Sequence, residues 1–168
     1  MNLTQKKDRI KLFKADQELP YHLLLLADET IEAIDKYIHD SEIYIYERDQ
    51  KTIGIYACQL LDGESLEIKN IAVSEEYQGE GIGQKLLSHA ISNATKRGFK
   101  NLMIGTSNAA FQQLYIYQKM GFRFHKVLKN FFTDNYKKEI VENGLVLNDM
   151  LLLKKDLQKE DVEVLQQS

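Results

Sequence analysis

Apolar and polar residues alternate in several short stretches of the chain, and such alternation is typical of half-buried strands. Residues 9–14 form the first of these stretches. Residues 43–47 and 52–61 are rich in β-branched and aromatic side chains and flank a polar turn, so they predict a hairpin. The dipeptide at 62–63 is Asp-Gly, a second turn signal, and it predicts a third strand over residues 66–73.

Two short helices are predicted between the first strand and the hairpin. Pro20 suits the first turn of a helix that runs to Ala27. Asp28 is a candidate N-cap for the second helix, in which Ile31, Ile34 and Ile38 fall on one face.

A longer helix is predicted after the third strand. Its apolar residues recur at every fourth position: Ile82, Leu86, Ala90 and Ala94. Gly98 follows at a position where a helix of this length would end. Residues 101–105 predict a short strand. Thr106, Ser107 and Asn108 are candidate N-caps for a further helix that continues to Met120 and ends at Gly121.

The last part of the chain predicts a strand over 122–132, a short helix over 133–141, a turn at 143–144, a final strand over 149–155 and a polar tail from 156. Antiparallel strands therefore come first, and a β-α-β-α-β order follows. This order predicts a mixed α/β or α+β fold, in which helices cover one sheet. No linker or repeat divides the chain, so residues 1–168 are interpreted as a single domain.

Composition narrows the possible class of protein. The 22 basic and 25 acidic residues give a formal net charge of −3, which argues against a nucleic-acid partner or an anionic membrane surface. Cys58 is the only cysteine, so an intrachain disulfide and a zinc site with several cysteine ligands are excluded. The sequence has neither a signal peptide nor an apolar run long enough to span a bilayer, and a cytoplasmic location is expected.

The most informative segment is VSEEYQGEGIG at residues 73–83, where a strand leads through glycines into a helix. Glycines let backbone N–H groups approach a ligand, and a helix N-terminus adds unpaired donors, so the segment predicts a phosphate site. A tight turn that binds nothing is the alternative. The spacing fails both the P-loop pattern and the dinucleotide pattern GxGxxG, because residue 84 is Gln where each would need Gly.

The pattern Q-x-x-G-x-G does fit, with Gln78, Gly81 and Gly83. Together with Tyr117, Gly121 and Phe122, which form Y-x-x-x-G-F further along, it resembles the GNAT family, the Gcn5-related N-acetyltransferases. The resemblance to the family covers about the whole chain, and the stretch from Ser107 through Asp149 also looks like a subgroup of small, mostly uncharacterised bacterial members. The resemblance implies a central, mostly antiparallel sheet of about seven strands flanked by helices. It also implies an acetyl-CoA-dependent N-acetyltransferase without a metal.

The resemblance further implies where acetyl-CoA binds. Its pyrophosphate would lie over the backbone amides of the glycine segment, and its pantetheine arm would pair with strand backbone that a bulge or splay leaves open. The implied cofactor residues are Ile71, Ala72, Val73, Gln78, Gly79, Glu80, Gly81, Ile82, Gly83, Gln84, Asn108 and Tyr117. For Asn108, a plain N-cap role is the alternative.

Acetyl transfer to an amine requires a proton acceptor for the amine and a proton donor for the leaving thiolate. By its place in the motif, Tyr117 is the candidate acid; that it only packs is the alternative. Tyr115, two residues earlier on the same helix, cannot face the same site. The resemblance also assigns the oxyanion donor to the Val73 amide.

Glu67 is the candidate base, because it lies six residues before Val73, as in some family members. Strand periodicity predicts that Glu67, Lys69, Ile71 and Val73 share one face. A solvated glutamate paired with Lys69 is the alternative.

Other reactive side chains fit no site. The four histidines show no metal-ligand spacing, and Cys58 is expected to be a buried, inert thiol. The acceptor is expected to be an amine on a small molecule or peptide, near the first two helices and the strands after Gly121. A homodimer is a further expectation from the family. A non-catalytic acyl-CoA-binding or sensing module is the alternative function.

Overall fold

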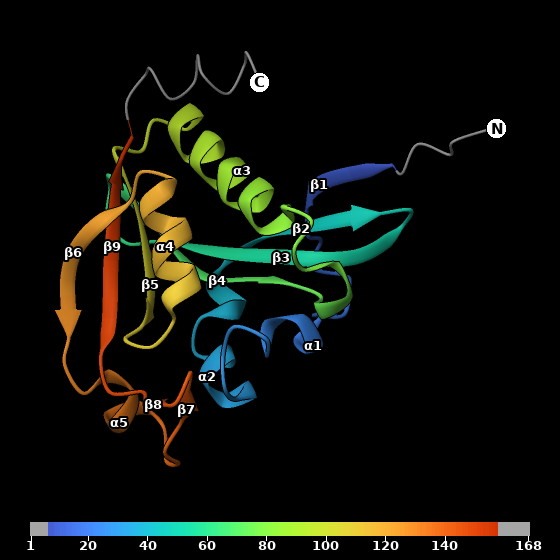
Figure 1. Cartoon of the computed structure of the whole chain (residues 1–168). Coiled ribbons are helices and arrows are strands. Elements are labelled where there is room, and N and C mark those ends of the chain that lie inside the picture. Colours follow the sequence, from blue (N-terminus) through green and yellow to red (C-terminus); the bar gives the residue numbers. More distant parts are fainter. Residues whose placement is uncertain (1–6, 158–168) are drawn as a thin grey trace.

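The computed structural model describes residues 7–157 and contains one seven-stranded sheet in the order β1-β2-β3-β4-β5-β9-β6 (Figure 1). Only β4 and β5 run parallel; every other neighbouring pair in this sheet is antiparallel, and the resemblance implied such a mostly antiparallel sheet of about seven strands. The strands are β1 (Asp8–Leu12), β2 (Glu42–Arg48), β3 (Lys51–Leu60), β4 (Ser65–Val73), β5 (Asn101–Ser107), β6 (Arg123–Leu128) and β9 (Met150–Asp156).

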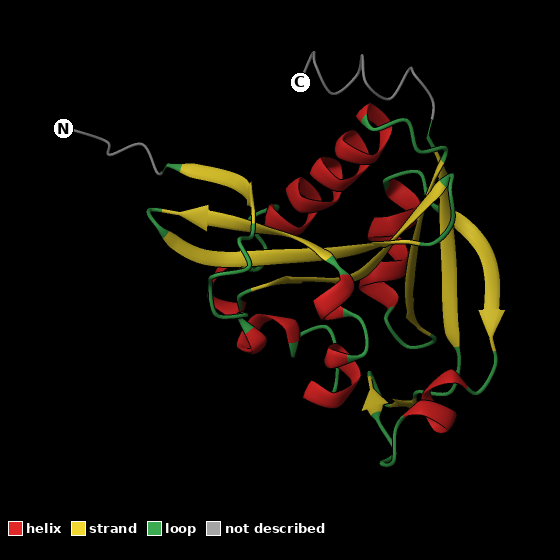
Figure 2. Cartoon of the chain, turned by 180° about the vertical axis from the view of Figure 1, so that it is seen from behind, coloured by secondary structure: helices red, strands yellow, loops and turns green. Residues whose placement is uncertain are grey.

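Helices cover both faces of this sheet. On one face, which we call the first face, α3 (Ile82–Lys96) and α4 (Phe111–Lys119) enclose the larger core. On the opposite, second face, α1 (Tyr21–Leu24), α2 (Ile31–Asp35) and the 3-10 turn η1 (Ile38–Asp40) enclose a smaller core against β2, β3 and β4 (Figure 2). Burial of these apolar side chains is the main stabilising contribution to both layers.

A smaller group of elements connects β6 to β9. It contains α5 (Phe131–Asn135) and a two-stranded hairpin of β7 (Val141–Glu142) and β8 (Leu145–Val146), which turns at Asn143 and Gly144 as predicted. The helix predicted over 133–141 is therefore misplaced, because only its first residues are helical. In Figure 1 this group lies at the same end of the molecule as α2.

Two predicted helix caps are wrong. Thr30, not Asp28, caps α2 by accepting a hydrogen bond from the Ala33 amide, because the Asp28 carboxylate is engaged by two tyrosines described below. None of residues 106–108 caps α4, since β5 continues to Ser107 and α4 begins only after Ala110. The predicted polar tail begins too early as well, because β9 includes Asp156; residues 158–168 lie outside the described part.

Candidate active site

The parallel pairing of β4 and β5 ends halfway along β4. Ser65 lies opposite Asn101, the register continues to Ile68 opposite Ile104, and there it stops. Beyond this point β5 remains paired with β9, and β4 with β3, so the two strands separate. The β4 edge at residues 69–73 therefore lacks a strand partner on its β5 side. Backbone donors and acceptors on such an edge can bind the amide groups of an extended ligand.

A β-bulge interrupts β4 just where the strands separate. Ala57 lies opposite Asn70 but Cys58 lies opposite Ile68, so Lys69 is the extra residue. A bulge shifts the alternation of faces by one residue. Side chains at Leu66 and Ile68 point to the first face, and so do those at Ile71 and Val73.

The prediction that Glu67 shares a face with Ile71 and Val73 is therefore wrong. Glu67 precedes the bulge and alternates with Leu66 and Ile68, so it points to the second face. Its side chain is 19% exposed, and its Oε1 lies 3.6 Å from Nζ of Lys69, so the two side chains are paired but Glu67 is not fully solvated.

The glycine segment connects β4 to α3 in a backbone conformation that suits an anion. Gly79 and Gly81 have φ values of +84° and +81°, which side-chain-bearing residues rarely adopt, and added Cβ atoms there would face open space. Gly81 is the N-cap of α3, and no side chain caps that helix. The first backbone N–H groups of a 15-residue helix thus remain available at its positive end.

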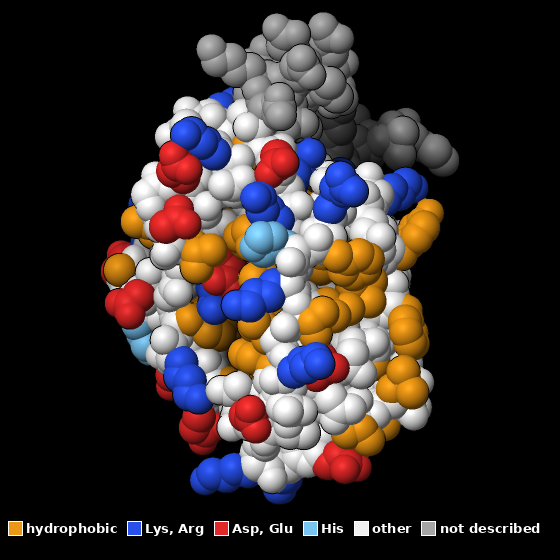
Figure 3. All heavy atoms as spheres, turned by 90° about the vertical axis from the view of Figure 1, so that its left-hand side faces the viewer, with side chains coloured by type: hydrophobic (Ala, Val, Ile, Leu, Met, Phe, Trp, Pro, Cys, Tyr) orange, Lys and Arg blue, Asp and Glu red, His pale blue; other side chains and the backbone are white. Residues whose placement is uncertain are grey.

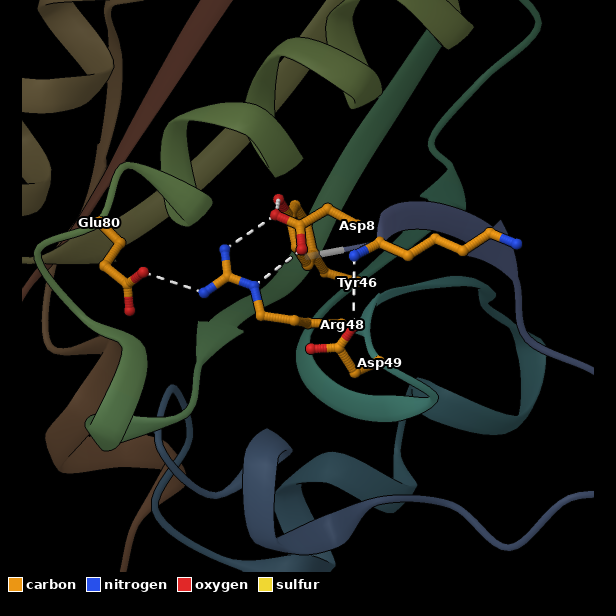
Figure 4. Close-up of polar contacts among 6 residues, drawn as sticks. Asp8, Tyr46, Arg48, Asp49 and Glu80 are labelled. Atoms are coloured by element: carbon orange, nitrogen blue, oxygen red, sulfur yellow. Dashed lines mark hydrogen bonds and ion pairs between the residues drawn. The ribbon is translucent and has the colours of Figure 1, made fainter. Parts of the chain in front are cut away.

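Two side-chain contacts hold this segment in place. Gln78 Nε2 donates a hydrogen bond to the Val73 carbonyl at 3.0 Å. Arg48 Nη1 donates one to Glu80 at 2.9 Å (Figure 4). The guanidinium of Arg48 also donates two hydrogen bonds to Asp8, at 2.7 and 2.8 Å, and thereby holds the pKa of that carboxyl well below its usual range. The segment is thus fastened to β2 and, through Arg48, to β1.

Tyr117 lies in the first-face core, where its ring packs against Phe122 with the ring centroids 6.2 Å apart. Its side chain is 7% exposed, and burial raises the pKa of its hydroxyl, so the phenol stays protonated at neutral pH. This hydroxyl makes no hydrogen bond to the side chains or backbone of residues 7–157. Tyr115 is 64% exposed and points elsewhere, as the helical spacing predicts.

A second-face cluster of polar residues was missed by the sequence reasoning. Asp28 accepts hydrogen bonds from the hydroxyls of Tyr136, at 2.6 Å, and Tyr37, at 3.1 Å. Asn70 Nδ2 donates to the Tyr37 hydroxyl at 2.9 Å and to the carbonyl of Leu24 at 3.0 Å, while its buried Oδ1 has no donor among the described residues. This cluster connects β4 with α1 and with the chain after α5.

Asn108 also holds the connection between β6 and β9. Its Nδ2 donates to the Val146 carbonyl, and its Oδ1 accepts hydrogen bonds from the amides of Asn148 and Asp149. Its predicted contact with acetyl-CoA stays a prediction, and the N-cap alternative is excluded.

The remaining reactive side chains include Cys58, which lies on β3 opposite Ile68. Cys58 is buried in β3, and burial raises the pKa of its thiol to about 11. Within the described ranges, His, Cys, Asp and Glu side chains form no group of three or more that could hold a metal ion. In residues 7–157, every helix is too short or too polar to cross a membrane.

Comparison with known proteins places the chain among acetyltransferases. Residues 39–124 match the sequence model of the Acetyltransferase (GNAT) domain. The uncharacterized N-acetyltransferase YvbK of Bacillus subtilis is 37% identical over 155 residues, which cover 92% of this chain and 100% of YvbK.

Solved structures are similar over most of the chain. A GNAT family acetyltransferase from Elizabethkingia anophelis with acetyl-CoA bound is 45% identical, with a TM-score of 0.87 over 89% of this chain and 98% of that one. A Bacillus subtilis acetyltransferase in complex with CoA is 38% identical, with a TM-score of 0.84 over 90% of this chain and 100% of that one.

Proposed function

Because this chain belongs to the GNAT family of acetyltransferases, we propose that it transfers an acetyl group from acetyl-CoA to a primary amine of a small molecule or peptide in a ternary complex. The observation that carries this proposal is the end of the β4–β5 pairing at Ile68 and Ile104, next to the glycine segment that opens α3. An open strand edge and an uncapped helix N-terminus suit an extended ligand with a phosphate end.

The proposed cofactor site follows this edge. Backbone groups of Ile71, Ala72 and Val73 would pair with the pantetheine arm. The pyrophosphate would be held by backbone amides between Gln78 and Gln84. The residues between these two are Gly79, Glu80, Gly81, Ile82 and Gly83. The fit is supported by the open space at Gly79 and Gly81.

Acetyl-CoA supplies an activated thioester, and the residues of this chain move the protons. Glu67 would take a proton from the attacking amine, directly or through water. As the new N–C bond forms, the Val73 amide would stabilise the charge on the acetyl oxygen. As the C–S bond breaks, Tyr117 would give its proton to sulfur.

Release of free CoA thiol over a panel of amines, polyamines, aminoglycosides and peptide N-termini tests this function. We expect thiol release to depend on both acetyl-CoA and one class of amine. Binding of acetyl-CoA without acetylation of any amine in the panel would instead support the acyl-CoA-binding module.

A further inference from the structure

The second face of the sheet is only half covered by helices. α1 and α2 pack against β2, β3 and β4. Figure 2 views this side and shows β9 and β6 without a helix in front of them. On β5, Met103 is still buried, with 4% of its surface exposed, so the part of this face that no helix covers is that of β9 and β6.

Strand register places charged residues across this uncovered face. Glu67 on β4 lies opposite Met103 on β5, Met103 opposite Lys154 on β9, and Lys154 opposite Arg123 on β6. Residues directly opposite each other share a face of the sheet. One carboxylate next to the gap is therefore aligned with cations on the two outer strands.

A third cation lies in the next row of the same face. Lys126 is opposite Leu152, and Leu152 is opposite Gly105. Gly105 leaves room that the Met150 side chain fills, since an added Cβ would lie 2.8 Å from its sulfur. The floor between the charges is thus apolar. Figure 3 looks onto this edge of the molecule and shows Lys and Arg side chains standing beside apolar ones.

Neighbouring strands lie about 4.8 Å apart, so Glu67 and Lys154 are separated by about 10 Å and Glu67 and Arg123 by about 14 Å. A ligand with a short aliphatic chain and a charged group at each end could therefore reach from Glu67 toward these cations.

Most of the positive charge on this face is not neutralised. Lys154 has Asp156 at 3.6 Å, but Arg123 and Lys126 are exposed and make no ion pair within residues 7–157. At the other end, Glu67 already has Lys69 as its partner. An acceptor with only an amine would gain nothing from the outer cations, whereas an anionic group on the acceptor would be attracted to them.

We propose that the acceptor is a small primary amine that also carries an anionic group. Its amine lies beside Glu67 at the gap between β4 and β5, and its anionic group lies over β9 and β6 against Arg123 and Lys126, with Lys154 between. This inference names the substrate class of the proposed acetyltransferase and rests on that function.

Three probes of similar length separate the contribution of the anionic group from that of the amine. ε-Aminocaproate and its uncharged amide differ only in the terminal group, and aminopentylphosphonate replaces the carboxylate by a phosphonate. Binding of each is measured by calorimetry with CoA present, so that no turnover is required. We expect the carboxylate or the phosphonate to bind about tenfold more tightly than the amide, the ratio that two exposed ion pairs can supply. The ratio should fall as salt is added.

The variant Arg123→Gln/Lys126→Gln should abolish this preference, because it removes both unpaired cations. Lys14→Gln is the matched control, since Lys14 is exposed and follows β1 at the opposite edge of the sheet. Equal binding of all three probes by the unchanged protein, or a preference that survives the double substitution, would overturn the proposal. Thiol release with the amide is measured separately. If thiol is released but the probes bind equally well, the acetyltransferase proposal stands and the anionic acceptor is refuted. If the anionic probes bind more tightly but no probe releases thiol, the acetyltransferase proposal is contradicted.

Discussion

Glu67 and Tyr117 lie on opposite faces of the sheet: Glu67 is on the second face, one residue before the β4–β5 pairing ends, and Tyr117 is in the first-face core. The bulge at Lys69 produces this arrangement, since without it Glu67 would point to the same face as Ile71. The two proton-transfer groups we propose therefore approach the reaction centre from different sides. An amine arriving over the second face would meet Glu67, and a thiolate leaving on the first face would meet Tyr117.

Tyr117→Phe should lower turnover by at least about tenfold while acetyl-CoA still binds, because the leaving sulfur loses its proton donor. The fold should be kept, since the hydroxyl makes no hydrogen bond to a described residue. Thiol-release kinetics and calorimetry measure the two properties. Tyr115→Phe, at an exposed position of the same helix, should change neither. Unchanged turnover in Tyr117→Phe would show that the acid is another group.

Glu67→Gln should reduce turnover at neutral pH and recover part of it at high pH, because a free alkylamine, with a pKa of about 10, loses its own proton there. The measurement is the pH profile of kcat/KM. Glu64→Gln serves as control, since Glu64 is exposed and pairs with Lys100 at 2.6 Å outside the site. A profile of unchanged shape would mean that Glu67 does not act as the base.

Glu80→Gln should weaken acetyl-CoA binding about threefold, because the glycine segment loses its charged contact with Arg48. A loss of affinity would be informative, since removal of a negative carboxylate near the negative pyrophosphate should by charge alone strengthen acetyl-CoA binding. Glu76→Gln removes the same charge from an exposed side chain nearby and should not weaken binding. Equal effects of both substitutions on the calorimetric Kd would refute the anchoring role of Glu80.

Gly81→Ala should raise the Kd for acetyl-CoA by about tenfold and destabilise the protein by about 1 kcal/mol. A side chain at φ = +81° is strained, and its Cβ would stand in the open space before α3. Gly63→Ala is the control, because Gly63 also has no neighbours but its φ lies outside the left-handed region. If Gly81→Ala lowered stability but left the Kd for acetyl-CoA unchanged, acetyl-CoA would not bind at this segment.

Acidification should destabilise the protein partly through His89. Burial, together with the charge of Lys96, lowers the pKa of His89, whose Nδ1 lies 2.8 Å from the Tyr56 hydroxyl. The folded state therefore binds fewer protons than the unfolded state, so this stabilisation is complete above the unfolded pKa of about 6.5 and is lost as the pH falls through the folded pKa. Thermal unfolding between about pH 7.5 and about pH 5.5 should show a smaller decrease for His89→Gln than for the unchanged chain. His22→Gln, at an exposed position, should behave like the unchanged chain.

Elements that depend on local sequence were predicted well. Gly98, which was expected to end the long helix, lies just after α3 and has a φ of +83°. The turn at Asn143 and Gly144 has positive φ at both residues. Such positions are recognised because few residues adopt left-handed backbone. The glycine segment before α3 was predictable for the same reason.

Features that depend on distant partners were not predictable. Strand alternation gave the wrong face for Glu67, because no local signal marks Lys69 as the bulged residue. Asp28 has the side chain of a good N-cap, yet Tyr37 and Tyr136 engage its carboxylate and leave the cap to Thr30. Pairing between strands and contacts of this range are decided by tertiary packing, which one sequence does not reveal.

The hydrogen bond between Asp28 and Tyr136 joins residues 108 positions apart, whereas Arg48 and Glu80 are 32 positions apart. Contacts close in sequence cost less chain entropy to form. We therefore expect the two sides of the proposed active site to assemble at different times: β2, β3, β4 and the start of α3 first, and the cluster around Asp28 only after β9 has joined the sheet. A ribosome that had released only the first hundred residues would already have delivered β4, the glycine segment and α3, while Asn108, Tyr117 and the partner of Asp28 would await the rest of the chain.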